Sequence, residues 1–267
     1  MRGLYFFLLQ LCLPLMSLCY AASGGDFQIL ILYEKGTAQG LHEIDAMNIK
    51  RTFKSIGKAI GKHTHILQLE CNKISMSTID KWCSKINHRN LAVVYYSGSN
   101  PENLAYNGLW PLIKLGAQDV SLDLLANKVR SKNARLSLVF SDSYNEVFDA
   151  NAIIRRFFGA PLGKVKSKRL INKLKRIWLL EKGHLTICSN KQREQSYGMR
   201  LNKRKDCMFG VFTEALLKYI GSRGADKPHP ILLRDLPEVV HNHLLEQSCF
   251  TPTKQYSFSE ADIREEE

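Results

Sequence analysis

Short apolar runs recur along the chain, separated by stretches in which apolar residues return every three or four positions. The runs have the composition of buried strands and lie at residues 27–33, 64–69, 91–96, 136–140 and 185–189, with a shorter candidate at 109–113. Helical spacing is found at residues 41–60, 76–86, 120–129, 211–220 and 237–245. Strands that alternate with helices predict an α/β domain with a mainly parallel sheet and helices on both faces.

Two of the predicted strands end in clusters of polar residues. Residues 97–101 read SGSNP and residues 141–145 read SDSYN. Ligands of open parallel sheets bind beyond the carboxyl ends of the strands. The sequence therefore predicts that any functional site lies where these two clusters meet.

The N-terminus has the layout of a secretory signal peptide. Met1-Arg2 gives a positive start, residues 4–16 are almost wholly apolar, and small residues follow at Cys19, Ala21 and Ser23. We expect cleavage after Ala21 or Ser23, so that residues 1–23 are removed and the protein is exported, either periplasmic or secreted. A lipoprotein acylated at Cys19 fits less well, because Leu18 is bulky where a small residue belongs, and an uncleaved anchor is the other alternative.

Composition narrows the class of protein further. The chain has 267 residues, 45% apolar and 24% charged, which is ordinary for a globular protein, and its formal net charge of +13 favours acidic partners. No later apolar run reaches the length of about 20 residues that a membrane span needs.

Five cysteines remain after the signal peptide, with no zinc-like spacing, and those at 71, 83 and 188 are predicted to be buried free thiols. Alternatively, the cysteines form one or two disulfides, whose pairing the sequence does not determine. The histidines at 63, 65, 241 and 243 lack further metal ligands at zinc spacing, so we expect no metal, and nothing indicates a cofactor.

Five weak motifs occur in a fixed order over most of the chain. They are Ile44-Asp45-Ala46, VVYYSG at 93–98, LSLVFSDS at 136–143, LTICS at 185–189 with Gln195 beyond, and GVFTEALL at 210–217. In this order they resemble the caspase-like cysteine peptidases, particularly bacterial and metacaspase-type members. The resemblance implies a three-layer caspase-like sandwich over residues 24–258 and a family activity of cysteine-type endopeptidase.

The two positions that carry the family's chemistry depart from its pattern. The catalytic His of the family falls on Ser99, which has no basic nitrogen, and the nucleophilic Cys falls on Tyr144, whose phenol ordinarily has a pKa of about 10. We therefore expect a catalytically inactive pseudopeptidase, a binding or regulatory module for an unknown protein or peptide ligand. The alternative is an active hydrolase with a rearranged site, for which a serine would need a new base.

Three residues beside these positions are candidates for a surviving substrate pocket: Gly98, Asp142 and Ser143. In metacaspase-type members the acid that Asp142 matches helps to bind a basic side chain. The competing interpretation is a loop carboxylate that caps backbone N–H groups.

Residues 164–176 carry seven Lys and Arg opposite an apolar stripe, which predicts a basic amphipathic helix inserted at about 160–180. The helix is either docked on the domain with its cations solvated, or it forms a surface that binds an anionic membrane or an acidic protein. Because an exported protein rarely meets nucleic acid, we do not expect nucleic acid as a partner. The candidate basic surface of the helix is Lys166, Arg169, Lys173 and Arg176. The tail at 259–267 carries five acids and is predicted to be disordered.

Overall fold

The computed structural model describes residues 24–36, 40–101, 105–143, 146–150, 162–191, 197–201, 208–220, 233–247 and 257–265. The predicted signal peptide at 1–23 lies outside the described residues.

A six-stranded sheet forms the centre of the molecule, in the order β11-β8-β6-β3-β1-β2. Five strands are parallel: β1 (Phe27–Tyr33), β2 (Thr64–Glu70), β3 (Leu91–Gly98), β6 (Leu136–Ser143) and β8 (Glu181–Cys188). The sixth, β11 (Phe258–Glu265), runs antiparallel to β8 at one edge.

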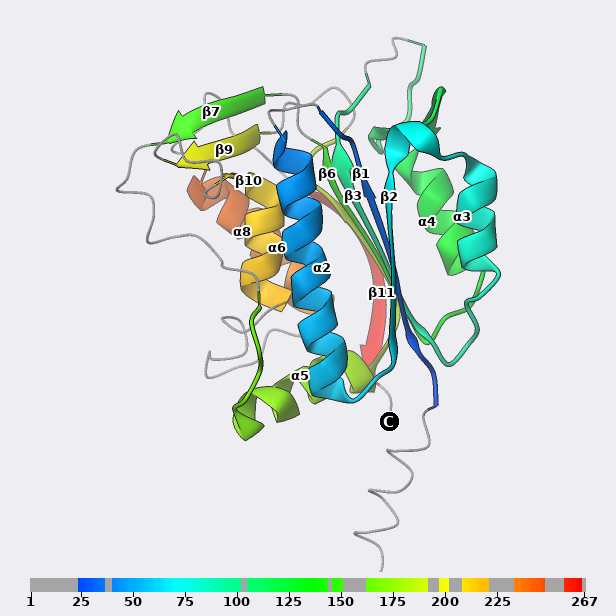
Figure 1. Ribbon diagram of the computed structural model, residues 1–267, viewed down its shortest axis with the longest axis vertical. Coiled ribbons are helices and arrows are strands. Elements are labelled where there is room, and N and C mark those ends of the chain that lie inside the picture. The colour runs from blue at the N-terminus through cyan, green and yellow to red at the C-terminus, as the bar shows by residue number, and fades with distance from the viewer. Residues whose placement is uncertain are drawn as a thin grey trace, which may run out of the picture.

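Helices cover both faces of this sheet (Figure 1). One face carries α2 (Leu41–Ile60), α5 (Lys168–Leu180), α6 (Val211–Ile220) and α8 (Leu236–Gln247), and the other carries α3 (Met76–Cys83) and α4 (Leu122–Arg130). The predicted three-layer α/β architecture with a mainly parallel sheet is therefore confirmed.

Alternation along the strands creates a separate core on each side of the sheet. In β1, Ile29 and Ile31 pack into the core under α2, whereas Leu30 and Leu32 pack into the core under α3 and α4, and all four are fully buried. The strands read as unbroken apolar runs because both of their faces are covered.

Smaller elements complete the described chain. They are the 3-10 turns Cys71–Lys73 and Leu233–Asp235, the hairpin of β4 (Leu112–Leu115) and β5 (Gln118–Ser121), and a three-stranded sheet of β7 (Glu146–Ala150), β9 (Tyr197–Leu201) and β10 (Met208–Gly210). The predicted helix at 120–129 begins only at Leu122, because Val120 belongs to β5 and the Ser121 side chain caps the helix by accepting from the Asp123 N–H.

The basic helix begins and ends later in the chain than the cations at 164–176 suggest. It begins at Lys168, where the Ser167 hydroxyl accepts from the Leu170 N–H at 3.4 Å, and it runs to Leu180. Its residues Leu174, Ile177 and Trp178 are buried, and the Trp178 ring lies 5.5 Å from that of Phe27. The apolar stripe is thus packed into the core of the domain.

The prediction of a disordered tail at 259–267 is wrong for residues 259–265, which belong to β11. The register of β11 pairs Phe258 with Cys188 and Glu265 with Glu181 along the whole of β8. Backbone pairing at a sheet edge needs no apolar side chains, so an acidic composition does not prevent it.

Cys71, Cys83 and Cys188 are buried free thiols, as predicted, whereas Cys207 and Cys249 lie outside the described residues. Among the described helices, none combines the length and the apolar character that would let it cross a bilayer.

Candidate functional site

The two polar clusters predicted at strand ends lie side by side, but partly inside the strands. The register of β3 and β6 places Ser97 opposite Asp142 and Gly98 opposite Ser143. Glu34 follows β1 directly, and its N–H donates to the Ser97 carbonyl at 3.0 Å. Residues from three neighbouring strands therefore meet at the carboxyl end of the sheet.

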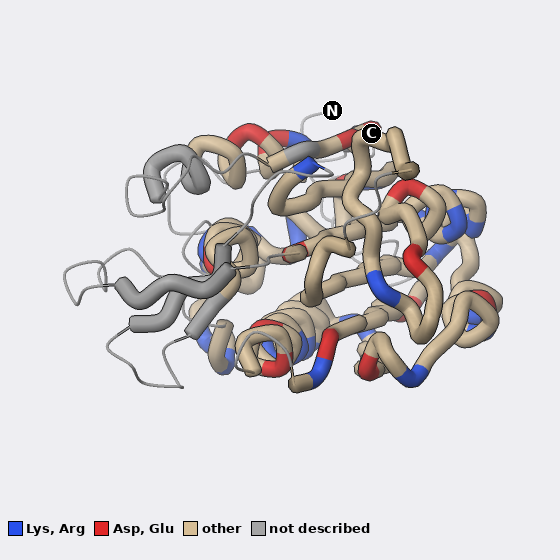
Figure 2. Tube along the Cα trace, turned by 90° about the horizontal axis from the view of Figure 1, so that it is seen from above, with Lys and Arg blue, Asp and Glu red and all other residues tan. Residues whose placement is uncertain are grey.

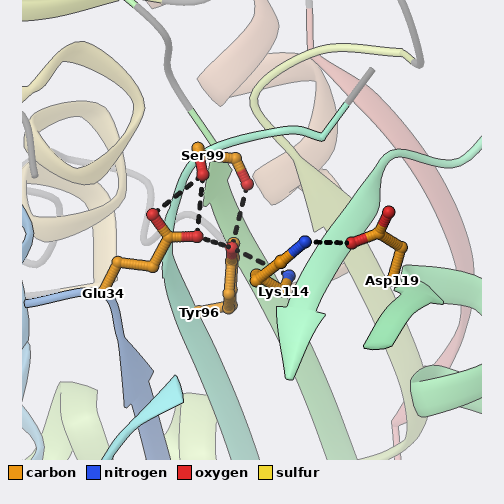
Figure 3. Close-up of polar contacts among 5 residues, drawn as sticks. All are labelled: Glu34, Tyr96, Ser99, Lys114 and Asp119. Atoms are coloured by element: carbon orange, nitrogen blue, oxygen red, sulfur yellow. Dashed lines mark hydrogen bonds and ion pairs between the residues drawn. The ribbon is translucent and has the colours of Figure 1, made fainter. Parts of the chain in front are cut away.

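Ser99, which the sequence resemblance aligns with the family's His, is held by a carboxylate. Its Oγ lies 2.8 Å from each carboxylate oxygen of Glu34, to which it donates. The Tyr96 hydroxyl lies 3.1 Å from Glu34 Oε1 and 2.9 Å from the Ser99 carbonyl oxygen, and the Lys114 N–H approaches that hydroxyl at 3.3 Å (Figure 3). Burial, followed by the negative charge of Glu34, raises the pKa of Tyr96 far above its usual value, so this hydroxyl stays protonated.

Gly98 makes room for this network. A Cβ at position 98 would collide with the Tyr96 hydroxyl and would lie 3.0 Å from Glu34 Cγ. The structure thus places the predicted pocket residue Gly98 beneath the Ser99 network, where the absence of a side chain lets Tyr96 and Glu34 approach each other.

A polar cavity of about 310 Å³ opens beside Ser99. Its lining residues are Glu34, Lys35, Asn72, Ser99, Pro101, Lys114 and Gly116. Both cations are paired with acids, since Lys114 Nζ lies 2.9 Å from Asp119 and Lys35 Nζ lies 3.3 Å from Glu70. The cavity therefore offers groups of both signs together with hydrogen-bonding partners.

His42, from the first turn of α2, contributes an imidazole to the same end of the sheet. Its Nδ1 lies 3.0 Å from Ser97 Oγ. His42 is 1% exposed and Ser97 is fully buried, and burial lowers the pKa of His42 to about 3, so the ring is neutral. The pair has the hydrogen bond of a nucleophile and its base, but no substrate carbonyl can reach it in this arrangement.

Asp142 is fully buried and caps α6. Its Oδ2 accepts from the Thr213 N–H at 2.8 Å and from the Thr213 hydroxyl at 2.5 Å, while Tyr95 bonds to the same hydroxyl. Burial raises the pKa of Asp142 to about 7 against the opposing effect of these bonds. Its Oδ1 has no hydrogen-bond partner in the described part of the chain. These contacts agree with the interpretation of Asp142 as a carboxylate that caps backbone N–H groups. Its pairing with a basic side chain of a ligand stays a prediction.

Asp45 links two of the motifs that suggested the fold. Its carboxylate accepts from the Gly210 N–H at 2.9 Å, so the start of α2 is bonded to the start of the GVFTEALL segment. With Asp142 on Thr213, two buried carboxylates fix the N-terminal end of α6 against the sheet.

Ser143 is buried at the end of β6. Its hydroxyl donates to Asn190 Oδ1 at 3.1 Å, and its N–H donates to Ser189 Oγ at 3.1 Å. Neither partner is a base, which removes the main support for Ser143 as a nucleophile. Tyr144, which the sequence resemblance aligns with the family's nucleophile, lies outside the described residues.

The candidate basic surface lies around α5, at the opposite end of the molecule (Figure 1). Lys166 precedes the helix, and Lys166, Arg169 and Arg176 are exposed, whereas Lys173 is half-buried. In the part of the chain that the structure describes, no group of three or more His, Cys, Asp or Glu is arranged to hold a metal ion.

Sequence reasoning missed Glu34 and His42. Both act across large separations, since 65 positions lie between Glu34 and Ser99 and 55 between His42 and Ser97. A signal was present, because the residue after a parallel strand and the first turn of the following helix both lie at the carboxyl edge of the sheet. Neither residue belongs to the motifs that drew attention to Ser99 and Asp142.

No protein-family model and no curated protein matches the chain. Among solved structures, 208 chains match. One of them, described as "structure of pro-sf-caspase-1", aligns with a TM-score of 0.52 over 89% of this chain and 91% of that chain, at 10% sequence identity. A likeness at this identity shows the fold alone, and the conclusion is that the chain has a caspase-like α/β fold.

Proposed function

We propose that this chain is an exported caspase-like domain that has lost peptidase activity and binds a peptide or protein ligand at the carboxyl end of its sheet. The observation that carries the proposal is the Ser99 hydroxyl, held by both oxygens of Glu34 at 2.8 Å beside an open polar cavity. A hydroxyl stands here in place of an imidazole, and its proton is already donated to a carboxylate.

Loss of activity follows from what a peptidase needs. Attack on a peptide carbonyl requires an activated nucleophile and a base whose pKa is near the working pH. The imidazole brought to this end of the sheet, His42, is buried and bonded to Ser97. Carboxylates ordinarily have pKa values of about 4, which makes them far weaker bases than imidazole.

Ligand binding is supported by the chemistry of the cavity. Glu34, Lys114 and the Ser99 hydroxyl offer a carboxylate, an ammonium and a hydrogen-bonding oxygen to a peptide that lies across the strand ends. Glu34 is only 7% exposed but lines the cavity, and a carboxylate forms charge-assisted hydrogen bonds with basic side chains. Glu34, rather than the fully buried Asp142, is therefore the acid that we assign to a Lys or Arg of the ligand.

The alternative function, a hydrolase with a rearranged site, has one observation in its favour. Ser99 and Glu34 form a hydroxyl–carboxylate pair that lines a cavity, which is the minimum geometry for an activated serine.

One experiment separates the two functions. The mature chain is incubated with fluorogenic peptides carrying Arg, Lys or Asp before the scissile bond, with an active caspase-type peptidase as positive control. We expect no turnover, no labelling by thiol-directed active-site probes, and saturable binding of the basic peptides by fluorescence polarisation.

Glu34→Gln should weaken that binding by about tenfold, the usual effect of losing one charge-assisted contact. Glu238→Gln on the exposed side of α8, a control that removes the same charge, should leave it unchanged. Turnover that disappears in Ser99→Ala or Ser143→Ala would refute the proposal and establish the hydrolase.

A further inference from the structure

A second, larger cavity lies between the outward face of α2 and the segment that leads into α5. Its volume is about 590 Å³. Four cations line it, Arg51, Lys54, Lys58 and Lys164, together with four apolar residues, Ala59, Leu162, Val165 and Ile171, and with Ser55 and Gly163. The cavity thus combines an apolar floor with a cationic rim.

The cations of α2 are concentrated on one face and are not balanced by acids. Arg51, Lys54 and Lys58 are spaced at i, i+3 and i+7, which places them on the same side of the helix. All three are exposed, and no described residue forms an ion pair with them or with Lys164. After Asp45 the helix contains no acid. Like charges at this spacing destabilise a helix, and a bound anion would relieve the repulsion.

The wall facing α2 is fixed in place. The Leu162 N–H donates to Thr52 Oγ1 at 3.0 Å, and the Leu162 side chain is 5% exposed within the core that α2 and α5 share. Ile171, in the first turn of α5, closes the floor. The cavity is thus built between anchored elements, as small-molecule sites usually are.

This cavity is remote from the proposed peptide site. It lies along the second half of α2, near α5, whereas Ser99 lies at the opposite end of the sheet (Figure 1). A ligand of one site therefore does not need the other.

We propose that this cavity binds a single-chain anionic amphiphile, an acyl chain that ends in a carboxylate or phosphate. The chain lies on Leu162, Val165 and Ile171, and the headgroup lies among the cations of α2. A small inorganic anion would leave the apolar floor exposed, and a neutral lipid would leave the cations without a counter-charge. The volume falls within the range of about 300–1,000 Å³ that small-molecule pockets occupy.

Isothermal titration calorimetry of the mature chain with laurate, kept below its micelle concentration, tests the proposal. We expect saturable one-site binding. The triple variant Arg51→Gln, Lys54→Gln, Lys58→Gln should bind laurate at least about tenfold more weakly, since three charge-assisted contacts are lost. The matched control Lys168→Gln, Arg169→Gln, Lys175→Gln removes the same charge from exposed residues of α5 that do not line the cavity and should bind as wild type does.

A second variant, Ser55→Phe, fills the cavity without changing its charge and should also abolish binding. Dodecyl phosphate that competes with laurate for the same site would support the proposal and assign a phosphate headgroup to it. Acetate or dodecanol binding as tightly as laurate would overturn it, because then one half of the amphiphile would suffice. Equal weakening in both triple variants, or binding to anionic vesicles with none to laurate, would also overturn it.

Discussion

Asp142 and His42 are buried titratable residues whose pKa values are shifted in opposite senses by the same cause. Burial raises the pKa of Asp142 from 3.8 to about 7 and lowers that of His42 from 6.5 to about 3. The folded chain keeps a proton on Asp142 that the unfolded chain releases above about pH 4, so this residue's contribution to stability falls as the pH rises towards 7. His42 is neutral in the folded chain and takes up a proton on unfolding below about pH 6.5, so its contribution falls as the pH drops towards 3.

The two contributions oppose each other between about pH 4 and 6.5, and single variants should separate them. Asp142→Asn leaves only the His42 effect, so the free energy of unfolding should rise with pH more steeply than in wild type, by a few kcal/mol across the window, at about 1.4 kcal/mol per unit of pKa shift. His42→Gln should make it fall with rising pH instead. Urea denaturation at several pH values measures both, with the exposed Asp80→Asn as a control. Parallel profiles in all four proteins would contradict the assignment.

At the scale of residues, local pattern predicted where polar side chains gather but not which contacts they make. The polar ends of two strands placed Ser99 and Asp142 at the carboxyl end of the sheet, because strand ends are read from local pattern. The partners Glu34, His42 and Thr213 come from other elements, and only the packed fold brings them within 3.0 Å of these strands. Long-range side-chain pairing leaves no periodic signal, so a single sequence does not predict it.

Among the elements, strands with both faces covered were predicted best, and the antiparallel edge strand β11 was not predicted. Residues 27–33 were predicted with the bounds that β1 has, because each of its side chains meets a core. β11 has the sequence FSEADIRE and pairs with one strand, β8. The exposed Glu260 of β11 forms an ion pair with Arg130 at 2.8 Å and does not pack into a core. Its order comes from backbone hydrogen bonds to β8, which any sequence without proline can form.

Gly183 determines how closely β11 can lie against β8. Its φ of +118° is rarely adopted by other residues, and a Cβ there would collide with the Asp262 carbonyl of β11. Gly183→Ala should destabilise the domain by about 1–3 kcal/mol and release β11. Urea denaturation and limited proteolysis of the C-terminus measure the two effects. Gly163→Ala is the matched control, since nothing lies within 4 Å of a Cβ at that position; equal midpoints for the two variants would show that β11 does not depend on Gly183.

The basic helix is a docked element that still exposes cations. Because Leu174 and Trp178 are buried in the core, α5 cannot insert its apolar stripe into a bilayer without leaving the domain. We propose that any contact with an anionic membrane is electrostatic, through Lys166, Arg169, Lys173 and Arg176. Such contact weakens steeply with salt, because the Debye length is about 8 Å at physiological ionic strength.

Replacing these four cations of α5 and its leading segment together by Gln tests that proposal. Each contributes on the order of 1 kcal/mol near an anionic surface, so co-sedimentation with phosphatidylserine vesicles at low salt should weaken by about a thousandfold. The melting temperature should change little, since three of the four charges are exposed and exposed charges add little to stability. The control removes four exposed cations from the other layer: Lys81, Lys85, Arg89 and Lys132. A lower melting temperature with unchanged vesicle binding would contradict the proposal. It would indicate that the α5 cations act only within the domain, where their aliphatic stems cover apolar surface.

Over the whole molecule, α2 connects two chemically different ends. Its first turn supplies His42 to the polar network at the carboxyl end of the sheet, and its second half supplies the cations of the amphiphile cavity near α5. Figure 2 shows Lys and Arg spread around the outside of the described chain with acids among them. The formal net charge of +13 is therefore dispersed, and the face of α2 stands out through its lack of acids.

The described cysteines are compatible with an oxidising compartment. Burial raises the pKa of Cys83 to about 11 and that of Cys71 still further, so these two thiols remain protonated. Cys188 is fully buried, so its thiol, like the other two, is shielded from oxidants. An exported protein can retain such thiols unpaired.

Export is the prediction that concerns the N-terminal segment. We propose that the positive start at Met1-Arg2, the apolar segment over residues 4–16 and the small residues at Ala21 and Ser23 direct cleavage by a signal peptidase. The described sheet begins after this segment, at Phe27 of β1, and β2 and β3, the strands that pair with β1, come from later in the chain. Intact-mass spectrometry of protein recovered from its native cells should show a chain that starts at Ala22 or Gly24.

Replacing Ala21 by a bulky residue should block cleavage after Ala21 and, since Ala21 also occupies a small-residue position for the second site, after Ser23. A retained Met1 in the native protein, or a lipid mass on Cys19, would show that the predicted cleavage is wrong.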